Sequence, residues 1–301
     1  MNILYIARHN QRNSNDDEGA IEYSLTLLGH RVEKLEEASG SGRSITGFDF
    51  LLCHHWNDLI SLKTYKIPRV FWCFDLIDYP KDPALKVRCE KRKQWITELT
   101  SLCDLGFCTD GEWVSRDTTG KLHWLPQGFD QRMISVYRPS SYVEGVSPPI
   151  LFTGVSKKGG DRRAAFVQAL IDRYGSRFTQ VERGVHGGSL AQLISSHKIV
   201  VAPNEPLYEK YWSNRIYLTL GYGGFLLHPY IDELSVSQYR DGEHLKYYHS
   251  MEHLFSLIDV CLTTQQSFLN KIADQGRAET LKNHTYTNRC EKLIEIVREN
   301  L

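Results

Sequence analysis

The sequence predicts an α/β fold made of two doubly wound, Rossmann-like domains that follow one another along the chain. Three observations predict it. Short apolar strand patterns alternate with amphipathic helix patterns, a polar and turn-rich segment interrupts them at residues 138–149, and the alternation restarts at Ile150. A chain of 301 residues can form two cores of ordinary size. Two such domains would leave a cleft at the carboxyl ends of their strands, where open α/β sheets bind ligands.

Residues 1–140 are expected to form the first domain. Short runs of apolar and β-branched residues predict strands over residues 3–7, 31–35, 49–53, 69–74, 105–108 and 122–125. Helical spacing predicts helices between them, over residues 19–28, 83–101 and 111–118. Strands that alternate with helices in this way favour a parallel sheet covered on both faces.

Residues 149–284 are expected to form the second domain on the same plan. Strands are predicted over residues 150–153, 178–182, 199–202, 225–227 and 244–248. Helices are predicted over residues 162–174, 189–196, 214–222, 250–261 and 265–282. Residues 285–301 contain a last helix, over 287–299, which we expect to pack back on the first domain.

Composition narrows the class of protein. Lys and Arg together number 36, as do Asp and Glu, so no global field favours a nucleic acid or an acidic membrane. A nucleic-acid partner is therefore possible but not favoured. The seven cysteines are an odd number without a Cys-x-x-Cys pair, which indicates buried thiols in a reducing compartment. We expect a cytoplasmic protein with no membrane span, because no apolar stretch reaches the roughly 20 residues that a span needs.

The segment from Tyr211 to Pro229 is the most informative in the chain. Ser213 is a natural N-cap, Asn214 and Arg215 fall in the first helical turn, and Gly223 with Gly224 ends the helix. The free N–H groups of a helix start attract anions, and the Arg215 guanidinium would add a fork of donors for a phosphate. The alternative is a capped core helix whose arginine points to solvent.

Two loops that follow strands of the second half add candidate ligands. Gly154, Lys158 and Arg162 lie in a glycine-rich basic loop that opens a helix, and such a loop suits a diphosphate. The loop is neither G-x-G-x-x-G nor Walker A, so the alternative is an ordinary flexible loop with solvated charges. Asn204, which follows the next buried strand, could contact a base or a sugar, or lie in a simple turn.

Asp75 directly follows an apolar strand of the first half. A carboxylate at the end of a strand could accept the proton of an acceptor hydroxyl. The alternative is an aspartate that caps a helix or shapes a turn, a role that fits Asp78 better.

Other polar groups in the first half suggest weaker hypotheses. His54-His55 and Arg8-His9 follow strands, but no cluster of cysteines or carboxylates has metal-ligand spacing, so we expect no metal site. The basic run from Lys86 to Lys93 favours a solvated helix face, with a polyanionic acceptor as the other interpretation.

Over residues 150–297 the chain resembles the GT-B glycosyltransferases of the glycosyl transferases group 1 clan, and within it the CgeB-like branch. Four segments carry this resemblance in the order and spacing of that branch. They are Phe152-Thr153-Gly154 with Arg162, Ser213-Asn214-Arg215, Gly223-Gly224-Phe225-Leu226-Leu227, and Gly276-Arg277 followed by His284-Thr285-Tyr286 and Arg289. The first half matches less closely, through Leu25 to Val32 and through Asp75.

The resemblance implies a GT-B fold and the metal-independent transfer of a sugar from a nucleotide-sugar donor, such as a UDP-sugar, to an acceptor hydroxyl. It implies retention of anomeric configuration and no cofactor beyond the donor. Arg215 would act on the diphosphate and Asp75 on the acceptor, with Gly154, Lys158, Arg162, Asn204, Ser213, Asn214, Gly223 and Gly224 around the donor. Related enzymes often carry a glutamate four residues after the motif's asparagine, where this chain has Leu218. Glu205 or Glu233 could replace that contact.

Two rival functions stay open at this point. One is glycosylation of a hydroxymethylated base in DNA, which the basic run permits and the zero net charge disfavours. The other is a sugar-nucleotide-binding protein without turnover, which Leu218 suggests. A nicotinamide oxidoreductase is a distant third, because the dinucleotide fingerprint is missing after the first strand of either half.

Overall fold

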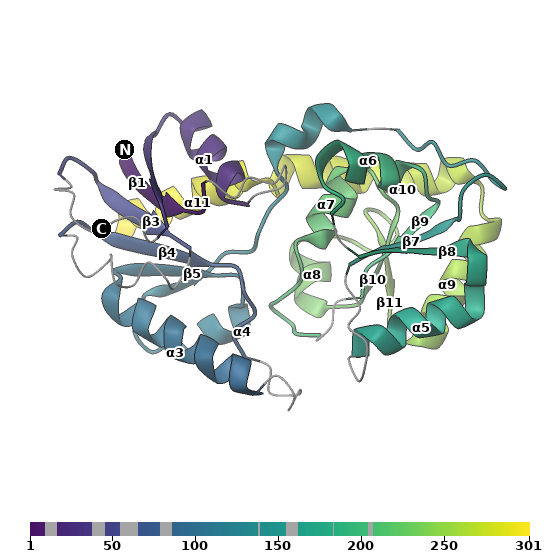
Figure 1. Cartoon of the computed structure of the whole chain (residues 1–301), viewed down its shortest axis with the longest axis horizontal. Helices are drawn as coiled ribbons and strands as arrows, with labels where there is room; N and C mark the ends of the chain where they lie inside the picture. The colour runs from purple at the N-terminus through teal and green to yellow at the C-terminus, as the bar shows by residue number, and fades with distance from the viewer. Residues whose placement is uncertain are drawn as a thin grey trace. The chain divides into compact units, whose positions relative to one another are not determined.

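The structure of the protein is a computed structural model. It describes residues 1–9, 17–37, 46–54, 66–78, 86–137, 139–154, 162–182, 184–203 and 207–301. The chain forms two compact units (Figure 1). Unit 1 contains Met1–Gln131 and Tyr286–Leu301, and unit 2 contains Arg132–Thr285.

Unit 1 is built on a parallel sheet with the strand order β2-β1-β3-β4-β5-β6. Its strands are β1 (Asn2–Ala7), β2 (Arg31–Glu36), β3 (Phe50–Cys53), β4 (Arg69–Cys73), β5 (Leu105–Cys108) and β6 (Leu122–Trp124). The central strands are buried on both faces, as expected where helices cover a parallel sheet on both sides.

Successive side chains of the strands in unit 1 point to opposite faces, so the sheet supports two cores. Ile3 and Tyr5 face helix α1 (Asp17–Leu27) and helix α11 (Tyr286–Asn300), while Leu4 and Ile6 face helix α3 (Lys86–Leu102). In Figure 1, α1 and α11 accordingly lie on one side of this sheet and α3 with the short α4 (Gly111–Val114) on the other. The α/β class and the predicted strands are confirmed.

Unit 2 repeats the plan with a parallel sheet in the order β11-β10-β9-β7-β8. Its strands are β7 (Ile150–Thr153), β8 (Phe178–Val181), β9 (Ile199–Val201), β10 (Leu226–Pro229) and β11 (Lys246–Tyr248). In both sheets the first strand has the second strand on one side and the third on the other, so each sheet has a topological switch point beside its first strand.

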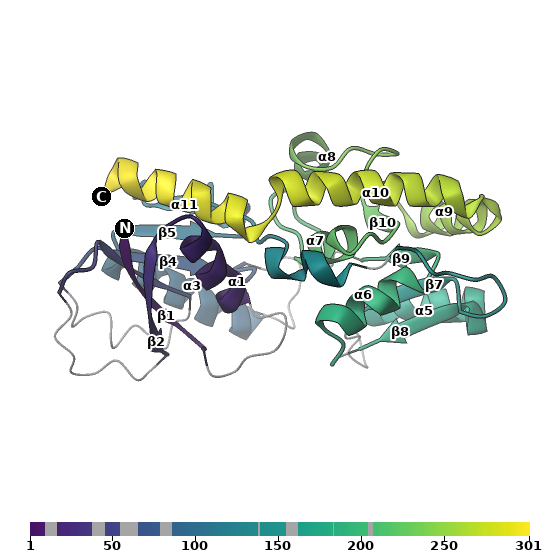
Figure 2. The ribbon, with the colours of Figure 1, turned by 90° about the horizontal axis from the view of Figure 1, so that it is seen from above.

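The helices of unit 2 also divide between the two faces of the sheet. One face carries α5 (Arg162–Tyr174) and α9 (Met251–Thr263), whose apolar side chains join those of the strands in one core. The opposite face carries α6 (Gly187–Ser195) and α7 (Arg215–Gly221), as Figure 1 shows. The long helix α10 (Gln266–Asn283), seen in Figure 2, contacts α7 and also contributes Leu269, Ile272 and Ala273 to the core of α5 and α9. The remaining helix, α8 (Asp232–Ser237), connects β10 to β11.

Helix α11 returns the end of the chain to unit 1. Cys290, Leu293 and Val297 are fully buried in the core that α1 shares with the first sheet. The backbone N–H of Tyr286 donates to the carbonyl of Phe129 (3.0 Å), beside the point where the chain leaves unit 1. The two passages of the chain between the units are therefore bound to each other within unit 1.

Three local predictions differ from the structure. Helix α4 ends at Val114, because the Asp117 carboxylate accepts the N–H groups of Thr119 and Leu122 and so forms a turn where the helix was expected to continue. Helix α8 and the 3₁₀ helix η3 (Gln131–Val136) were not predicted, because both span only six residues. Within the described ranges, no helix is long and apolar enough to cross a membrane.

Candidate functional site

The segment before α7 is anchored by buried aromatic residues. Trp212 donates its indole N–H to the Tyr217 hydroxyl (2.7 Å), which in turn donates to Gln238 Oε1 (2.8 Å). Both aromatic side chains are buried, so these bonds are shielded from water. They fix the position at which α7 begins, and with it the base of the Arg215 side chain.

The start of α7 differs from the prediction by one residue. Asn214, not Ser213, is the N-cap residue, and its side chain makes no capping hydrogen bond. Ser213 Oγ still accepts the backbone N–H of Arg215 at 3.4 Å. The helix is only seven residues long, so its dipole is weak and an anion site here depends on the Arg215 side chain.

Arg215 is a half-buried cation that has no counter-ion among the described residues. No described residue places a carboxylate within ion-pair distance of it, and its guanidinium lies over the Phe152 ring, 5.7 Å from the ring centroid. Burial and the nearby positive charge of Arg163 lower the pKa of Arg215 to about 10. Two like charges at one sheet edge attract an anion, because an anion reduces their mutual repulsion.

Gly154 makes room for this guanidinium. It directly follows β7, its N–H donates to the Val181 carbonyl (2.8 Å), and its own carbonyl accepts from Gln180 (3.0 Å). A Cβ at Gly154 would lie 3.1 Å from Arg215 Nη2 and 2.9 Å from the Phe152 ring. The predicted site residues Gly154 and Arg215 therefore meet at the switch point of the second sheet.

An apolar pocket of about 420 Å³ opens at the carboxyl ends of β9, β10 and β11. Its wall includes Phe166, Pro203, Pro229, Tyr230, Tyr248 and His249. The two cations lie near this pocket. Arg163 precedes the lining residue Ala165 on α5, and the charge of Arg215 adds to the burial that lowers the pKa of His228, next to Pro229, to about 4.

The two glycines at the far end of α7 are not brought to Arg215. The N–H of Gly223 donates to Leu220 and that of Gly224 to Thr219, which ends the helix. A Cβ at Gly223 would lie 2.6 Å from the Tyr137 ring, and one at Gly224 would lie 2.6 Å from Ile194. Close packing at a helix end accounts for both glycines.

Three other predicted donor residues are not described at the level of their side chains. Lys158 and Asn204 lie outside the described residues, as does Glu205. Arg162 is the first residue of α5, but its side chain is also outside the described part. Leu218, at the position of the family glutamate, is half-buried within α7, and Glu233 lies in the first turn of α8.

In unit 1, Asp75 lies just past the end of β4 and forms an ion pair with Arg92. Arg92 Nη2 donates to Asp75 Oδ1 (2.8 Å), and Arg92 Nη1 donates to the Leu76 carbonyl (2.7 Å). The Arg92 side chain is 7% exposed and that of Asp75 is 64% exposed. The expectation of a solvated face for the basic run is wrong at Arg92, whose long side chain reaches from α3 to the end of β4.

Two further aspartates at this sheet edge have both carboxylate oxygens occupied. Asp78 binds Lys93 (2.9 Å) and Arg116 (2.8 Å), and although its partial burial opposes ionisation, these bonds lower its pKa. Asp110 accepts the N–H groups of Ile77 (2.9 Å) and Trp113 (3.0 Å). Asp78 therefore has a structural role, through two ion pairs and not through the turn that was expected for it.

The histidines that follow strands serve the core. His54 is buried, with Nδ1 2.8 Å from the Trp72 carbonyl and Nε2 2.7 Å from the Tyr5 hydroxyl. Both ring nitrogens therefore have protein partners. His9 Nε2 lies 3.1 Å from the Tyr5 carbonyl. Across the described part of the chain, no three His, Cys, Asp or Glu side chains could jointly hold a metal ion.

A buried polar network in unit 1 was not predicted. Asp17, the first residue of α1, accepts the Tyr286 hydroxyl (2.5 Å) and the Gln127 side-chain amide (3.0 Å), and Arg289 donates to the Gln127 carbonyl (3.1 Å). Burial raises the pKa of Asp17 to about 6 against the opposing bond from Tyr286. Sequence patterns could not pair residues that are 269 positions apart.

The same C-terminal motif supplies contacts in unit 2. A Cβ at Gly276 would lie 2.3 Å from the His244 carbonyl oxygen, so only glycine allows α10 to pack this closely. Arg277 lies over the ring of Tyr137, 4.0 Å from its centroid. The motif therefore contacts the connecting segment at both of its ends. In unit 2, Arg277 packs on Tyr137, and in unit 1 Tyr286 and Arg289 bind the carbonyls of Phe129 and Gln127.

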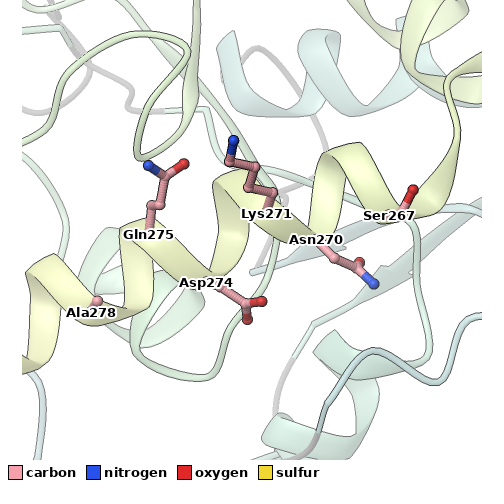
Figure 3. A pocket seen from close by; sticks show the side chains of 6 residues that line it. All are labelled: Ser267, Asn270, Lys271, Asp274, Gln275 and Ala278. Carbon is pink, nitrogen blue, oxygen red and sulfur yellow. The ribbon is translucent and has the colours of Figure 1, made fainter.

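Helix α10 also carries a shallow polar pocket, shown in Figure 3. Its lining residues are Ser267, Asn270, Lys271, Asp274, Gln275 and Ala278. All six come from one face of a single helix, and none belongs to the predicted site. The donor site expected at Arg215 does not include this face of α10.

The C-terminal part of the chain is similar to a known protein family. Residues 162–295 match a protein family described as glycosyl transferase-like. The match covers 134 of the 301 residues of the chain, so the chain is similar to this family over its C-terminal part. No curated protein matches the chain by sequence.

Solved glycosyltransferase structures share the whole fold of the chain. Sucrose-phosphate synthase from Thermosynechococcus elongatus is 11% identical, with a TM-score of 0.70 over 99% of this chain and 98% of that one. Anabaena HepE, solved with UDP and glucose, is 11% identical with a TM-score of 0.63 over 98% and 99%. An alpha-glucosyltransferase solved with UDP and DNA is 12% identical with a TM-score of 0.65 over 99% and 100%. The predicted GT-B fold is confirmed.

Proposed function

We propose that the protein is a glycosyltransferase that moves a sugar from a nucleotide-sugar donor to an acceptor hydroxyl. One observation carries the proposal: Arg215 is half-buried, lies beside a second guanidinium, and has no carboxylate partner in the part of the chain that the structure describes. A cation costs free energy to bury unless an anion compensates it. The diphosphate of a nucleotide sugar is such an anion, and the glycosyl transferase-like segment includes this region.

The reaction needs positive charge at the leaving group. The bond between the sugar C1 and the diphosphate oxygen breaks and leaves its electron pair on the diphosphate, the acceptor oxygen bonds to C1, and the Asp75 carboxylate would take the proton of the acceptor hydroxyl. Arg215 and Arg163 would stabilise the negative charge that develops on the departing diphosphate. Because two guanidiniums can supply this charge, we propose a metal-independent reaction, with retention at C1 as the family resemblance implies.

The remaining roles follow the predicted site. Gly154 admits the guanidinium, and Ser213 and Asn214 hold the start of α7, while Lys158, Arg162 and Asn204 would contact the donor from neighbouring loops. Asp75 would contact the acceptor hydroxyl. Assignment to the CgeB-like branch and a UDP-hexose as donor belong to this proposal, supported by relatives of the same fold that were solved with UDP. Gly223 and Gly224 would act only by ending α7.

The test is donor binding to an arginine variant with a matched control. Arg215→Ala is expected to weaken UDP and UDP-glucose binding about 100-fold in calorimetry, because a charge-assisted fork to the diphosphate is lost. Arg240→Ala removes an exposed arginine of the same unit and should leave binding unchanged. Wild-type UDP affinity in Arg215→Ala, with an unchanged melting temperature, would remove the central assignment.

A further inference from the structure

The three aspartates near the carboxyl ends of β4 and β5 differ in one respect. Asp78 and Asp110 each bind protein groups through both carboxylate oxygens. The Asp75 carboxylate binds Arg92 through Oδ1, and among the described residues no hydrogen bond or ion pair involves Oδ2. Both oxygens of Asp78 and of Asp110 are therefore bound within the protein, whereas Oδ2 of Asp75 can still accept a hydrogen bond.

Arg92 controls the direction of that spare oxygen. Its guanidinium is buried and bound at two points, to the Leu76 carbonyl and to Asp75 Oδ1, so it has little freedom to move. A fixed donor on Oδ1 restricts the rotation of the carboxylate. The side chain of Asp75 is nevertheless mostly exposed, so the oriented oxygen faces solvent.

The charges around Asp75 define what Oδ2 can bind. Three described positive groups at this edge are already bound, Arg92 to Asp75 and Leu76, and Lys93 and Arg116 to Asp78. An exposed carboxylate attracts hydroxyl hydrogens and repels phosphate oxygens. A neutral polyol or sugar therefore matches this edge better than a phosphorylated or nucleic-acid acceptor.

We propose that Arg92 is a positioning residue that directs Asp75 Oδ2 toward the hydroxyl of an uncharged, sugar-like acceptor. This inference rests on the proposed glycosyltransferase function and goes beyond it by naming the acceptor class. Asp75 Oδ2 accepts a hydrogen bond from the acceptor hydroxyl, and Arg92 holds the carboxylate without touching the substrate.

The first test separates positioning from folding. With UDP-glucose as donor and glucose as acceptor, Asp75→Asn is expected to lower kcat/KM for the acceptor about 100-fold and Arg92→Gln about tenfold, with UDP affinity unchanged. The double variant should be no slower than Asp75→Asn, because Arg92 acts through Asp75. Losses that multiply would overturn the positioning role.

Two variants keep this test decisive if Arg92→Gln folds poorly. Asp75→Asn changes an exposed side chain and can still accept from Arg92, so it should melt like the wild type. Arg116→Gln removes another cation of the same edge, one that binds Asp78, and should leave kcat/KM unchanged. Equal losses in Arg116→Gln and Arg92→Gln would contradict a specific role for Arg92.

The acceptor class is tested with a pair of probes that differ by one phosphate. Transfer to glucose should exceed transfer to glucose 6-phosphate at least tenfold, and Asp75→Asn should reduce this ratio, because the repelling charge is gone. Preference for the phosphorylated probe or for duplex DNA, or transfer to neither, would overturn the inference while UDP binding still supported the proposed function. A wild-type protein that failed to bind UDP would remove both.

Discussion

The carboxyl ends of the two sheets share a topology and carry opposite charges. In unit 1 a buried arginine fixes an exposed carboxylate, Asp75, so the group offered to solvent is an anion with one open oxygen. In unit 2 the group at the corresponding edge is a half-buried guanidinium, Arg215, with a second arginine close by. The first edge is suited to hydroxyl hydrogens and the second to phosphate oxygens.

This difference shows that the same sheet topology can present either an anion or a cation at its carboxyl edge. Which ligand the edge suits depends on which charged group has no protein partner. At the unit 1 edge, Arg92, Lys93 and Arg116 are all committed to carboxylates. At the unit 2 edge, no carboxylate of the described residues binds Arg215. The proposed division into an acceptor-binding unit and a donor-binding unit is consistent with this contrast.

The largest expected effect comes from a substitution that fills the space beside Arg215 in unit 2. Gly154→Ala places a Cβ against Phe152 and Arg215 Nη2, so the guanidinium must move. We expect UDP affinity to fall between about tenfold and 100-fold and the free energy of unfolding to fall by about 1–3 kcal/mol. Calorimetry and chemical denaturation measure the two effects.

Gly175→Ala is the matched control for this change. Gly175 has a φ of +53°, so alanine is strained there too, but a Cβ would meet nothing within 4 Å. We expect a loss of about 1 kcal/mol in stability and unchanged UDP affinity. Equal effects on UDP in the two variants would show that backbone strain, and not the displaced guanidinium, matters.

Acid should move the stability of the two units in opposite directions. The folded pKa of Asp17 in unit 1, about 6, lies above its ordinary value of 3.8, so its contribution is present at low pH and is lost as pH rises through about 6. The folded pKa of His228 in unit 2, about 4, lies below its ordinary 6.5, so its contribution is present above pH 6.5 and is lost as pH falls toward 4. Each effect should amount to about 1–3 kcal/mol.

Amide hydrogen exchange resolved by residue measures both units in one sample. Between about pH 7 and pH 4.5, protection should increase in unit 1 and decrease in unit 2 after correction for intrinsic exchange rates. Asp17→Asn should remove the change in unit 1, and His228→Gln the change in unit 2. Parallel changes in both units would contradict the assignment of these two groups.

The smallest expected effect comes from Asp78→Asn, which we compare with Asp75→Asn at the same sheet edge. Asp78→Asn weakens the bonds to Lys93 and Arg116 at a site that is 12% exposed, so we expect a loss of about 1 kcal/mol in stability. Acceptor kcat/KM should stay within about twofold of the wild type, unlike that of Asp75→Asn. A loss of acceptor kinetics as large as in Asp75→Asn would show that the turn, and not the spare oxygen, binds the acceptor.

Periodicity and turn chemistry were sufficient to predict most of the fold. Strands such as β3 and β5 are short, apolar and followed by turn residues, so their type and position were readable. Proximity of Gly154 to Arg215 was also readable, because residues after neighbouring parallel strands meet at one edge of the sheet. Short elements such as α8 leave too little pattern to detect.

Long side chains and distant pairs could not be predicted from local patterns. Helical spacing placed Arg92 in a basic run, but nothing local indicated that its guanidinium reaches the end of β4. Gly223 and Gly224 belong to a motif that was expected to surround the donor. The Tyr137 and Ile194 side chains that pack on them come from other parts of the chain. The hydrogen bond from Tyr286 to Asp17 likewise depends on tertiary structure alone.

The return of α11 to the first unit sets an order of events during synthesis. Residues 132–285, which form unit 2, lie between the two segments of unit 1 and are all synthesised before α11. The earlier-made unit must wait, with the apolar face of α1 and its sheet uncovered, until Cys290, Leu293 and Val297 emerge. A refolded chain truncated after residue 285 should therefore leave residues 1–131 more open to protease than the full chain does.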